Sequence, residues 1–301
     1  MRVTNNQIYL VTLQNLKKPI RRILENQTQL ASGKRINRHA DDPLGSGEVQ
    51  KYKSQLANVR QYQKNIRDGL TLLQQTELAL NRLESNLIRA KALTVQAANA
   101  SNSRENREII AQEINQILEE VLSVANTQFR DRYLFAGRNT TSRPFVEVRD
   151  EQGRIESLTL SADNSGEIFR EIDRGVTIAV NIPGDDIFNL STGPFATLLD
   201  LREALEKNDI EGIKKSLDAI DNVLDLSLSA RTRIGARMQR MQNVLESQEN
   251  TEINLIDITA QIEDADIAEL TMKLAGNELS YRSAIGAAGR ILQTSLVDIL
   301  T

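Results

Sequence analysis

The sequence contains no cysteine and no tryptophan, and its aromatic residues are six phenylalanines and five tyrosines in 301 residues. The lack of cysteine excludes disulfides, thiolate nucleophiles and zinc–thiolate sites. So few aromatic side chains are a thin supply of large core-filling groups for a globular enzyme of this size. Long helices joined along narrow apolar seams need few aromatics, and the composition therefore favours a helical architecture.

Prolines and long apolar runs are also scarce. The five prolines leave residues 44–143 and 195–301 free of helix breakers of this kind. No run of about 18 apolar residues occurs, so no membrane span is predicted. The first residues have neither the apolar core nor the small-residue cleavage site of a secretory signal, which predicts a cytosolic protein or export without a cleaved signal.

The two proline-free stretches carry apolar residues at steps of three, four or seven. This spacing predicts helices with narrow apolar seams, as in antiparallel bundles and coiled coils. The polar segment 100–106 predicts a reversal between two helices, with Ser101 or Ser103 as N-cap and Glu105 in the first turn. The predicted seams include Val59, Ile66, Leu70, Leu73, Leu80, Leu83, Leu87, Ala90, Ile110, Ile114, Ile117, Val121, Val124, Ile213, Leu217, Ile220, Leu224, Leu228, Ile234, Met238, Met241 and Leu245.

Both ends of the chain repeat the amphipathic pattern. Such stripes are expensive to leave exposed on an isolated subunit, so we expect another subunit or a chaperone to cover them. The expected contacts of the N-terminal stripe are Leu13, Leu16, Ile20 and Ile23. Those of the C-terminal stripe are Leu274, Tyr281, Ile285, Leu292, Leu296, Ile299 and Leu300.

The middle of the chain has a different pattern. Residues 138–195 hold three of the five prolines and five glycines, with Gly137 just before them. Runs that favour strands occur at 145–160, 167–172 and 176–182, and the DEQG turn at 150–153 predicts a hairpin within the first run. The sequence therefore predicts a mainly α protein, a long helical coiled-coil rod formed by both chain ends, with a small β-rich domain inserted in the middle.

The segment 32–48, SGKRINRHADDPLGSGE, interrupts the helical pattern and contains the single histidine. Gly33 suits a left-handed helix cap, and Asp42 before Pro43 suits a helix start. Asp41 adds negative charge at the positive end of that helix, and Ile36 is one apolar anchor in the loop. We therefore interpret the segment as a joint between two helices. Its motif residues are Gly33, Arg35, Ile36, Asn37, Asp41, Asp42 and Pro43.

Chemical interpretations of this segment are weaker. His39 has no second histidine with which to hold a metal, and adjacent aspartates before a proline suit capping better than shared coordination. The GSG sequence at 45–47 lacks the Lys-Ser/Thr of a phosphate loop, and no nucleophile, base and orienting group come together in the sequence. We expect no catalytic residue, no metal site and no cofactor.

Charge is unevenly distributed along the chain. Residues 1–65 hold 12 Lys and Arg against 4 Asp and Glu, whereas residues 196–301 hold 11 against 18. A basic start suggests nucleic acid, but no basic stripe with interleaved aromatics is present, so pairing of the basic start with the acidic end is favoured. The arginines of RTRIGARMQRMQ at 231–242 leave open a phosphate grip, with a solvated or subunit-contacting helix face favoured.

Three segments resemble the bacterial flagellin superfamily. LASGKRINRHADDPLG at 30–45 is similar to its N-terminal signature, IEDADIAELTMKLAGNELSYRSAIGAAGRILQTSLVDIL at 262–300 to its C-terminal region, and RTRIGARMQRMQNV at 231–244 to a third segment. Asp41-Asp42-Pro43, RDRYLFAGRNTTSRPF at 130–145 and GVTIAVNIPGDDIF at 175–188 are most like the hook–filament junction proteins, the L-type hook-associated family.

This resemblance implies terminal helical arms at 1–43 and 262–301, a helical rod at 44–137 and 196–261, and a β-rich outer domain at 138–195. It implies a structural adaptor that assembles as a ring between the first hook-associated protein and flagellin. It also implies export by the flagellar type III apparatus, an extracellular place at the hook–filament junction, and a cytoplasmic pool held by a dedicated chaperone. No nucleic acid and no membrane are expected as partners. The alternatives are a minor filament flagellin or, in another class, a coiled-coil nucleic-acid-binding protein.

Overall fold

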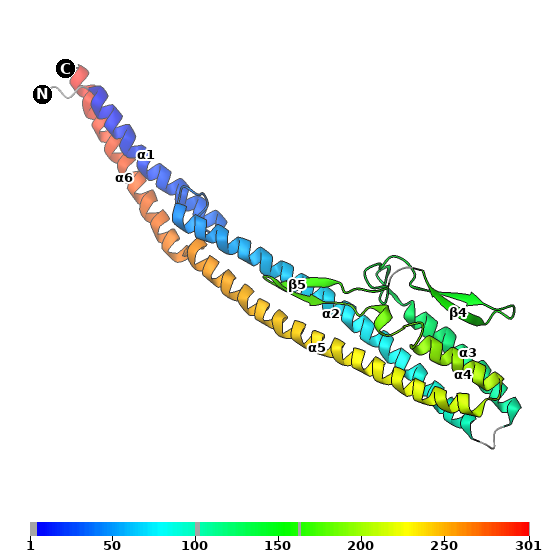
Figure 1. Cartoon of the computed structure of the whole chain (residues 1–301). Coiled ribbons are helices and arrows are strands. Elements are labelled where there is room, and N and C mark those ends of the chain that lie inside the picture. The colour runs from blue at the N-terminus through cyan, green and yellow to red at the C-terminus, as the bar shows by residue number, and fades with distance from the viewer. Residues whose placement is uncertain (1–4, 100–102, 162–163, 301) are drawn as a thin grey trace. The chain divides into compact units, whose positions relative to one another are not determined.

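The computed structural model describes residues 5–99, 103–161 and 164–300, and the chain divides into two compact units. One unit comprises residues 1–58 and 250–301, and the other comprises residues 59–249. The predicted class, mainly helical with a small β-rich region in the middle, is confirmed (Figure 1). The helices are α1 (Asn5–Ser32), α2 (Pro43–Ala98), α3 (Arg104–Ala125), α4 (Pro194–Glu206), α5 (Ile210–Glu263) and α6 (Ile267–Leu300).

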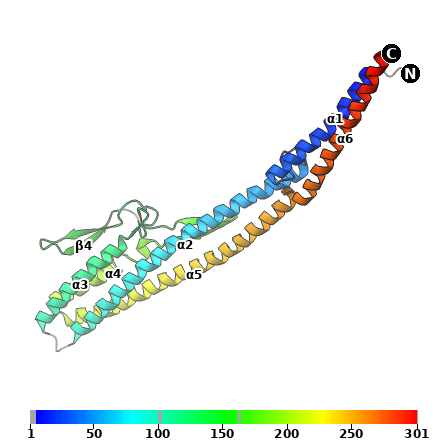
Figure 2. The same cartoon turned by 180° about the vertical axis from the view of Figure 1, so that it is seen from behind.

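The unit that joins the two ends of the chain is built on α1 and α6. These helices lie side by side and antiparallel, the start of α1 next to the end of α6, as both views show (Figures 1 and 2). Each helix buries one narrow stripe. Pro19 and Asn26 are buried on α1, and Leu270 and Ala288 on α6. A single pair of helices covers only one stripe of each, so the other faces of both helices remain exposed.

The second unit packs α3, α4, the part of α2 from Val59 to its end and the part of α5 from its start to Glu249 around a continuous apolar core. The predicted seam of α2 is confirmed, because Ile66, Leu73 and Leu80 are fully buried. On α5 the prediction was partly wrong. Leu228 is 55% exposed, while Ser227 next to it is fully buried. The buried face of α5 keeps the helical period but includes the small polar residue Ser227. A pattern based only on apolar residues does not include this position.

The predicted reversal after α2 is confirmed. Helix α2 ends at Ala98 and α3 begins at Arg104. The hydroxyl of Ser103 accepts a hydrogen bond from the backbone N–H of Asn106 at 3.2 Å, and Glu105 lies in the first turn. Ser103 is therefore the N-cap, and its hydroxyl satisfies one of the free N–H groups at the helix start. Ser101, the alternative cap, lies outside the described residues.

In the described residues, the β-rich region consists of two-stranded antiparallel sheets. The strands are β1 (Gln128–Phe129), β2 (Arg132–Tyr133), β3 (Phe145–Arg149), β4 (Ile155–Leu160), β5 (Phe169–Asp173) and β6 (Val176–Ala179), and each antiparallel pair joins neighbours in sequence. The predicted hairpin is β3–β4. In its turn the Asp150 carboxylate accepts the N–H groups of Gln152 and Arg154, both at 2.9 Å, and Gly153 adopts a φ of +80°. A short 3₁₀ turn at Gly184–Asp186 precedes α4.

Four of the six phenylalanines join this region to the helices. Phe135, Phe145, Phe188 and Phe195 are each at most 1% exposed, and their ring centroids lie 5.0–5.8 Å apart. These separations are typical of stabilising aromatic pairs. The small aromatic supply of the sequence is therefore concentrated at one place, while the helical seams use aliphatic side chains. Of the helices in the described part of the chain, none is long and apolar enough to cross a membrane.

Candidate functional site: a joint of two facing helix breaks

Two interruptions of the helices meet in the unit that contains both chain ends. The loop between α1 and α2 (residues 33–42) lies against the short break between α5 and α6 (residues 264–266). The N–H of Arg35 donates to the Glu263 carbonyl at 2.7 Å, and the N–H of Ala265 donates to the Gly33 carbonyl at 3.0 Å. Residues some 230 positions apart thus satisfy each other's helix-end groups, and the two breaks form one joint.

Gly33 ends α1 and begins the first break. Its φ is +69°, the left-handed conformation in which a helix commonly ends, and no atom lies within 4 Å of the position a Cβ would take. Glycine is therefore favoured here by the left-handed backbone conformation and not by a lack of space for a side chain. The structure agrees with the predicted role of Gly33 as the cap of α1.

The paired aspartates have separate structural tasks. One Asp41 oxygen accepts the backbone N–H groups of Asn37 at 3.0 Å and Arg38 at 2.8 Å, which closes the loop. Asp42 accepts the N–H of Gly45 at 2.9 Å and so caps α2, which begins at Pro43. This backbone hydrogen bond, with the Arg35 guanidinium, holds the pKa of Asp42 below its usual range. Both carboxylates are committed to the loop and the helix start, which is the arrangement of a cap.

Arg35 and Ile36 attach the loop to the opposite break. The Arg35 guanidinium donates to the Ile262 carbonyl at 2.8 Å and lies 3.3 Å from an Asp42 oxygen. Ile36 is 7% exposed and is the apolar anchor of the loop. A Cβ on Gly45 would lie 2.9 Å from the Ile36 side chain and 2.6 Å from Asp42, so Gly45 lets the start of α2 approach both.

Glu263 is the electrostatic centre of the joint. Its buried carboxylate lies 2.9 Å from the Lys34 ammonium and 2.7 Å from the Lys53 ammonium. Burial opposes the charged form and is the strongest single influence, but the two ammonium groups together outweigh it and leave the pKa of Glu263 below its usual range. Its partner responds in the opposite direction, since the hydrogen bond to Glu263 raises the pKa of Lys34.

Asp266 completes the second break. One of its oxygens accepts the N–H groups of Ala268 at 2.8 Å and Glu269 at 3.0 Å, and thereby caps α6. Sequence analysis identified the IEDAD segment by resemblance and missed its place in the joint. The signal was present, because an aspartate directly before a run of helix-forming residues is typical of an N-cap.

The predicted arm contacts fall on different faces of α1 and α6. Leu13, Leu16 and Ile23 are half-buried, whereas Ile20 is 38% exposed. On α6, Leu274 and Tyr281 are half-buried and Ile285 is 46% exposed. Leu292, Leu296, Ile299 and Leu300 belong to α6, but their side chains lie outside the described part of the chain. Their roles in contacts with other subunits or a chaperone stay predictions.

The outer faces of the two arm helices expose large apolar side chains that the sequence analysis did not single out. They are Leu10, Val11 and Leu24 on α1 and Met272 and Leu279 on α6, each more than half exposed. Each of these five side chains leaves apolar surface in contact with solvent. We call them, with Ile20 and Ile285, the outer arm face.

The arginine run of α5 serves the fold of the second unit. Arg231 forms ion pairs with Glu77 at 2.7 Å and with Glu84, both on α2. Arg237 forms an ion pair with Glu167 at 2.5 Å and donates to the Asn181 carbonyl at 2.9 Å. The favoured interpretation of a solvated or subunit-contacting face was therefore wrong for these two arginines, because their charge is used within the chain.

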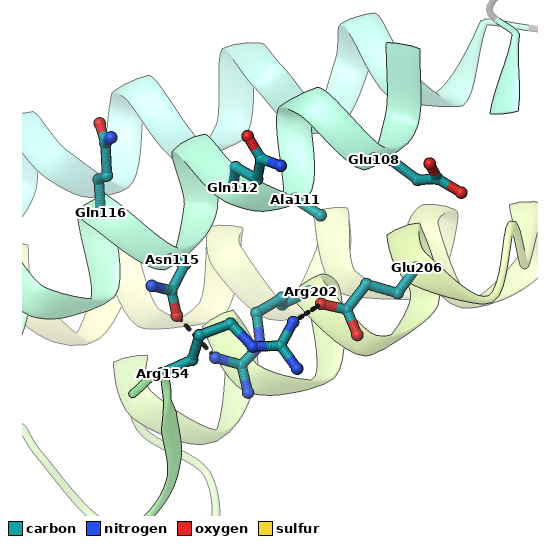
Figure 3. A pocket seen from close by; sticks show the side chains of 8 residues that line it. All are labelled: Glu108, Ala111, Gln112, Asn115, Gln116, Arg154, Arg202 and Glu206. Atoms are coloured by element: carbon teal, nitrogen blue, oxygen red, sulfur yellow. Dashed lines mark hydrogen bonds and ion pairs between the residues drawn. The ribbon is translucent and has the colours of Figure 1, made fainter. Parts of the chain in front are cut away.

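A cavity of about 500 Å³ opens between α3, α4 and the start of β4 (Figure 3). In it Arg154 lies 2.7 Å from Glu206, and Arg202 donates to the Asn115 amide oxygen at 2.7 Å. Its charges are balanced, and it lacks an aromatic platform. In the described residues no group of three His, Cys, Asp or Glu side chains is placed to hold a metal ion. The joint thus remains the best-built candidate site.

We expect Glu263→Gln to loosen the joint. The amide keeps the shape but removes the charge that holds two lysines, so local opening becomes easier by about 1–2 kcal/mol, a value kept low because both ammonium groups reach solvent. Hydrogen exchange at the Arg35 and Ala265 amides should then accelerate about 5- to 30-fold. The matched control is Glu203→Gln, which removes one carboxylate from an exposed pair with Lys207 on α4. Unchanged exchange at the joint in Glu263→Gln would contradict the role of Glu263.

The same carboxylate makes the joint sensitive to acid. Since the pKa of Glu263 is lowered by folding, its stabilisation is complete above the ordinary glutamate pKa of about 4.3 and is lost as the pH falls through the lower folded value. The protection factor at the joint, which corrects the exchange rate for the intrinsic slowing of amide exchange in acid, should therefore fall below about pH 4 in the natural chain. In Glu263→Gln this acid dependence should be smaller, with Asp42 supplying what remains.

Comparisons with known proteins agree with this architecture. The family model described as the bacterial flagellin N-terminal helical region matches residues 3–140, which include the joint loop. A flagellin of Listeria monocytogenes is 26% identical over 294 residues, which cover 98% of this chain and 96% of that protein. The crystal structure of Bacillus cereus FlgL shares 28% identity and a TM-score of 0.57 over 70% of this chain and 99% of that one. The flagellar junction protein FlgL from Legionella pneumophila has a similar fold, with 18% identity and a TM-score of 0.57 over 73% of this chain and 100% of that one.

Proposed function

Because the chain belongs to the bacterial flagellin superfamily, whose members are structural proteins of the flagellum, we propose that it is a structural adaptor that forms the hook–filament junction. The observation that carries the proposal is the likeness to Bacillus cereus FlgL, which extends over 99% of that chain. The junction protein from Legionella pneumophila has the same fold. These likenesses, and the small β-rich region between long helices, support the proposal.

In this proposal the subunits form a ring between the first hook-associated protein and flagellin. The outer arm face supports this role, because large apolar side chains such as Leu24, Met272 and Leu279 gain most when neighbouring subunits cover them. Before assembly, a dedicated chaperone would cover the same face in the cytoplasm, and the chain would leave through the flagellar type III apparatus. The role is mechanical and involves no catalytic turnover.

The joint connects the arm helices to the rest of the chain through two loop segments, which gives the adaptor a double mechanical connection. In the unit that contains both chain ends, the breaks at 33–42 and 264–266 are held together by reciprocal backbone hydrogen bonds and by Glu263 between two lysines. A load on α1 passes through residues 33–42, and a load on α6 passes through residues 264–266. Because the breaks are clamped to each other, we infer that they bear load together, and that neither loop stretches alone.

A minor filament flagellin is the second candidate, and the likeness to the Listeria monocytogenes flagellin over 96% of that protein favours it. Self-assembly separates the two functions. A filament flagellin extends long filaments on its own seeds, while a junction protein adds a limited number of subunits to hook ends and then stops.

Immuno-electron microscopy of isolated hook–filament preparations tests the proposal directly. An antibody against residues 145–182, which include the β3–β4 and β5–β6 hairpins, should label a narrow band between hook and filament. Label along the whole filament would identify a filament flagellin instead. A preparation without label on hooks or filaments would refute both functions. Antibody absorbed with the purified chain is the matched control for specific label.

A further inference from the structure

The unit that contains both chain ends has an open groove between α1 and the joint loop. Its volume is about 690 Å³, and the outer side of α1 and the joint loop line it. Ile20 and Leu24, which are 38% and 57% exposed, supply its apolar part. Arg38 and Ala40 line it from the loop. Backbone hydrogen bonds hold the joint loop, which forms one side of the groove, against residues 263–265.

The groove is basic. Lys17, Arg21 and Arg38 line it, together with Glu25 and Asp41. Asp41 is occupied by two backbone N–H groups of the loop, and Glu25 lies 4.0 Å from Arg21. No described carboxylate lies within ion-pair distance of Lys17 or Arg38, so two positive charges flank the apolar part without a partner. The groove therefore fits an apolar ridge that carries negative charge.

The last part of α5 and the residues that directly follow it have this complementary character. Residues 250–272 hold six acidic side chains and no lysine or arginine. Ile253, Ile256 and Asp257 stand at spacings of three and four and are exposed, with Ile253 at 63% and Ile256 at 44%. The Asp264 side chain is exposed in the break that directly follows α5. We call these four residues the acidic ridge.

We propose that the basic groove of one copy receives the acidic ridge of a second copy, in a head-to-tail contact. This inference rests on the proposed assembly role and assigns a pair of surfaces to it. The groove is built from α1 and the loop, whereas the ridge is built from α5 and the break after it, so each copy carries one groove and one ridge. A contact between two different surfaces leaves a free surface at each end and continues into a ring or an open helical array.

The lack of native cysteine allows a direct test by crosslinking. We expect purified full-length Leu24→Cys and Ile253→Cys, mixed and treated with a short bismaleimide, to form a covalent dimer that contains one chain of each variant. Either variant alone should form no dimer. The matched control pairs Leu24→Cys with Ile88→Cys, which places the second thiol at a similarly exposed isoleucine of α2. Absence of the mixed dimer, or a dimer of Leu24→Cys with itself, would overturn the head-to-tail contact.

Charge exchange provides a second, independent readout. Arg38→Glu and Asp257→Arg should each weaken self-association in sedimentation experiments about 3- to 10-fold, and the chain that carries both changes should regain most of it. Arg82→Glu, the same change at an exposed position of α2, should leave association unchanged. Additive loss in the double variant would overturn the pairing. The immuno-electron microscopy result does not depend on these surfaces, so a failed contact and a failed junction role are distinguishable.

Discussion

Removal of residues 285–301 should abolish attachment of filaments and binding of the export chaperone, while the unit of residues 59–249 unfolds at its usual temperature. The deletion takes Ala288, which is buried between α6 and α1, and Ile285 from the outer arm face. Helix α1 then loses its partner along its first part, and a single amphipathic helix does not bury enough surface to offset its chain entropy. Filament counts on cells, motility, and copurification with the chaperone measure the loss.

The second unit supplies the internal check for this deletion. Its core is formed by α2, α3, α4, α5 and the aromatic cluster, and the removed residues contribute nothing to it. Its thermal transition, followed by circular dichroism, should therefore persist. Arg282→Ala, at an exposed position of α6, should assemble normally. Normal filaments on cells that carry the deletion would contradict the role of the C-terminal arm.

The helical parts of the fold were predictable because their signal is local. A residue such as Leu73 or Leu80 lies on the buried face because of its spacing from its neighbours, and this spacing survives whatever partner covers the face. Ser103 was predictable as a cap for the same reason, since a hydroxyl before a helix satisfies N–H groups only three residues away. Ser227 on α5 was not predictable, because its burial depends on where neighbouring helices lie and not on its own polarity.

Half of the joint was predictable. Gly33 and Asp42 act at helix ends close in sequence, where local patterns predict them. Asp41 was predicted only as negative charge near a helix start, whereas its carboxylate closes the loop. The other half depends on contacts across some 230 residues. Nothing local distinguishes Glu263 from the other acidic residues around it, and only the folded chain brings Lys34 and Lys53 to its carboxylate.

The arginines of α5 show the same limit from the opposite direction. A cluster of positive charge was interpreted as an external face because its partners are far away in the sequence. Arg231 finds Glu77 and Glu84 on α2, and Arg237 finds Glu167 before β5. Net charge along a segment therefore predicts a partner of opposite sign, but the sequence alone does not say whether this partner belongs to the same chain.

Phe188→Ala should destabilise the second unit more than any other single change considered for this chain. Phe188 is fully buried and contacts three rings, with centroid separations of 5.0 Å to Phe135, 5.6 Å to Phe145 and 5.8 Å to Phe195. Its truncation leaves a cavity where the β-rich region meets the helices, because neighbouring backbone is fixed by the 3₁₀ turn before it. The expected loss is about 3–5 kcal/mol in the free energy of unfolding, a large share of a typical domain's total.

A phenylalanine of the same region provides the matched control. Phe169 in β5 is 54% exposed, so Phe169→Ala should change the free energy of unfolding by no more than about 0.5 kcal/mol. Urea denaturation followed by circular dichroism measures both variants, and hydrogen exchange in β3 and β6 locates the loss. The aromatic cluster holds the β-rich region to the helices only if Phe188→Ala accelerates exchange in the strands far more than Phe169→Ala does. Equal effects of the two changes would mean that the cluster is not the anchor of this region.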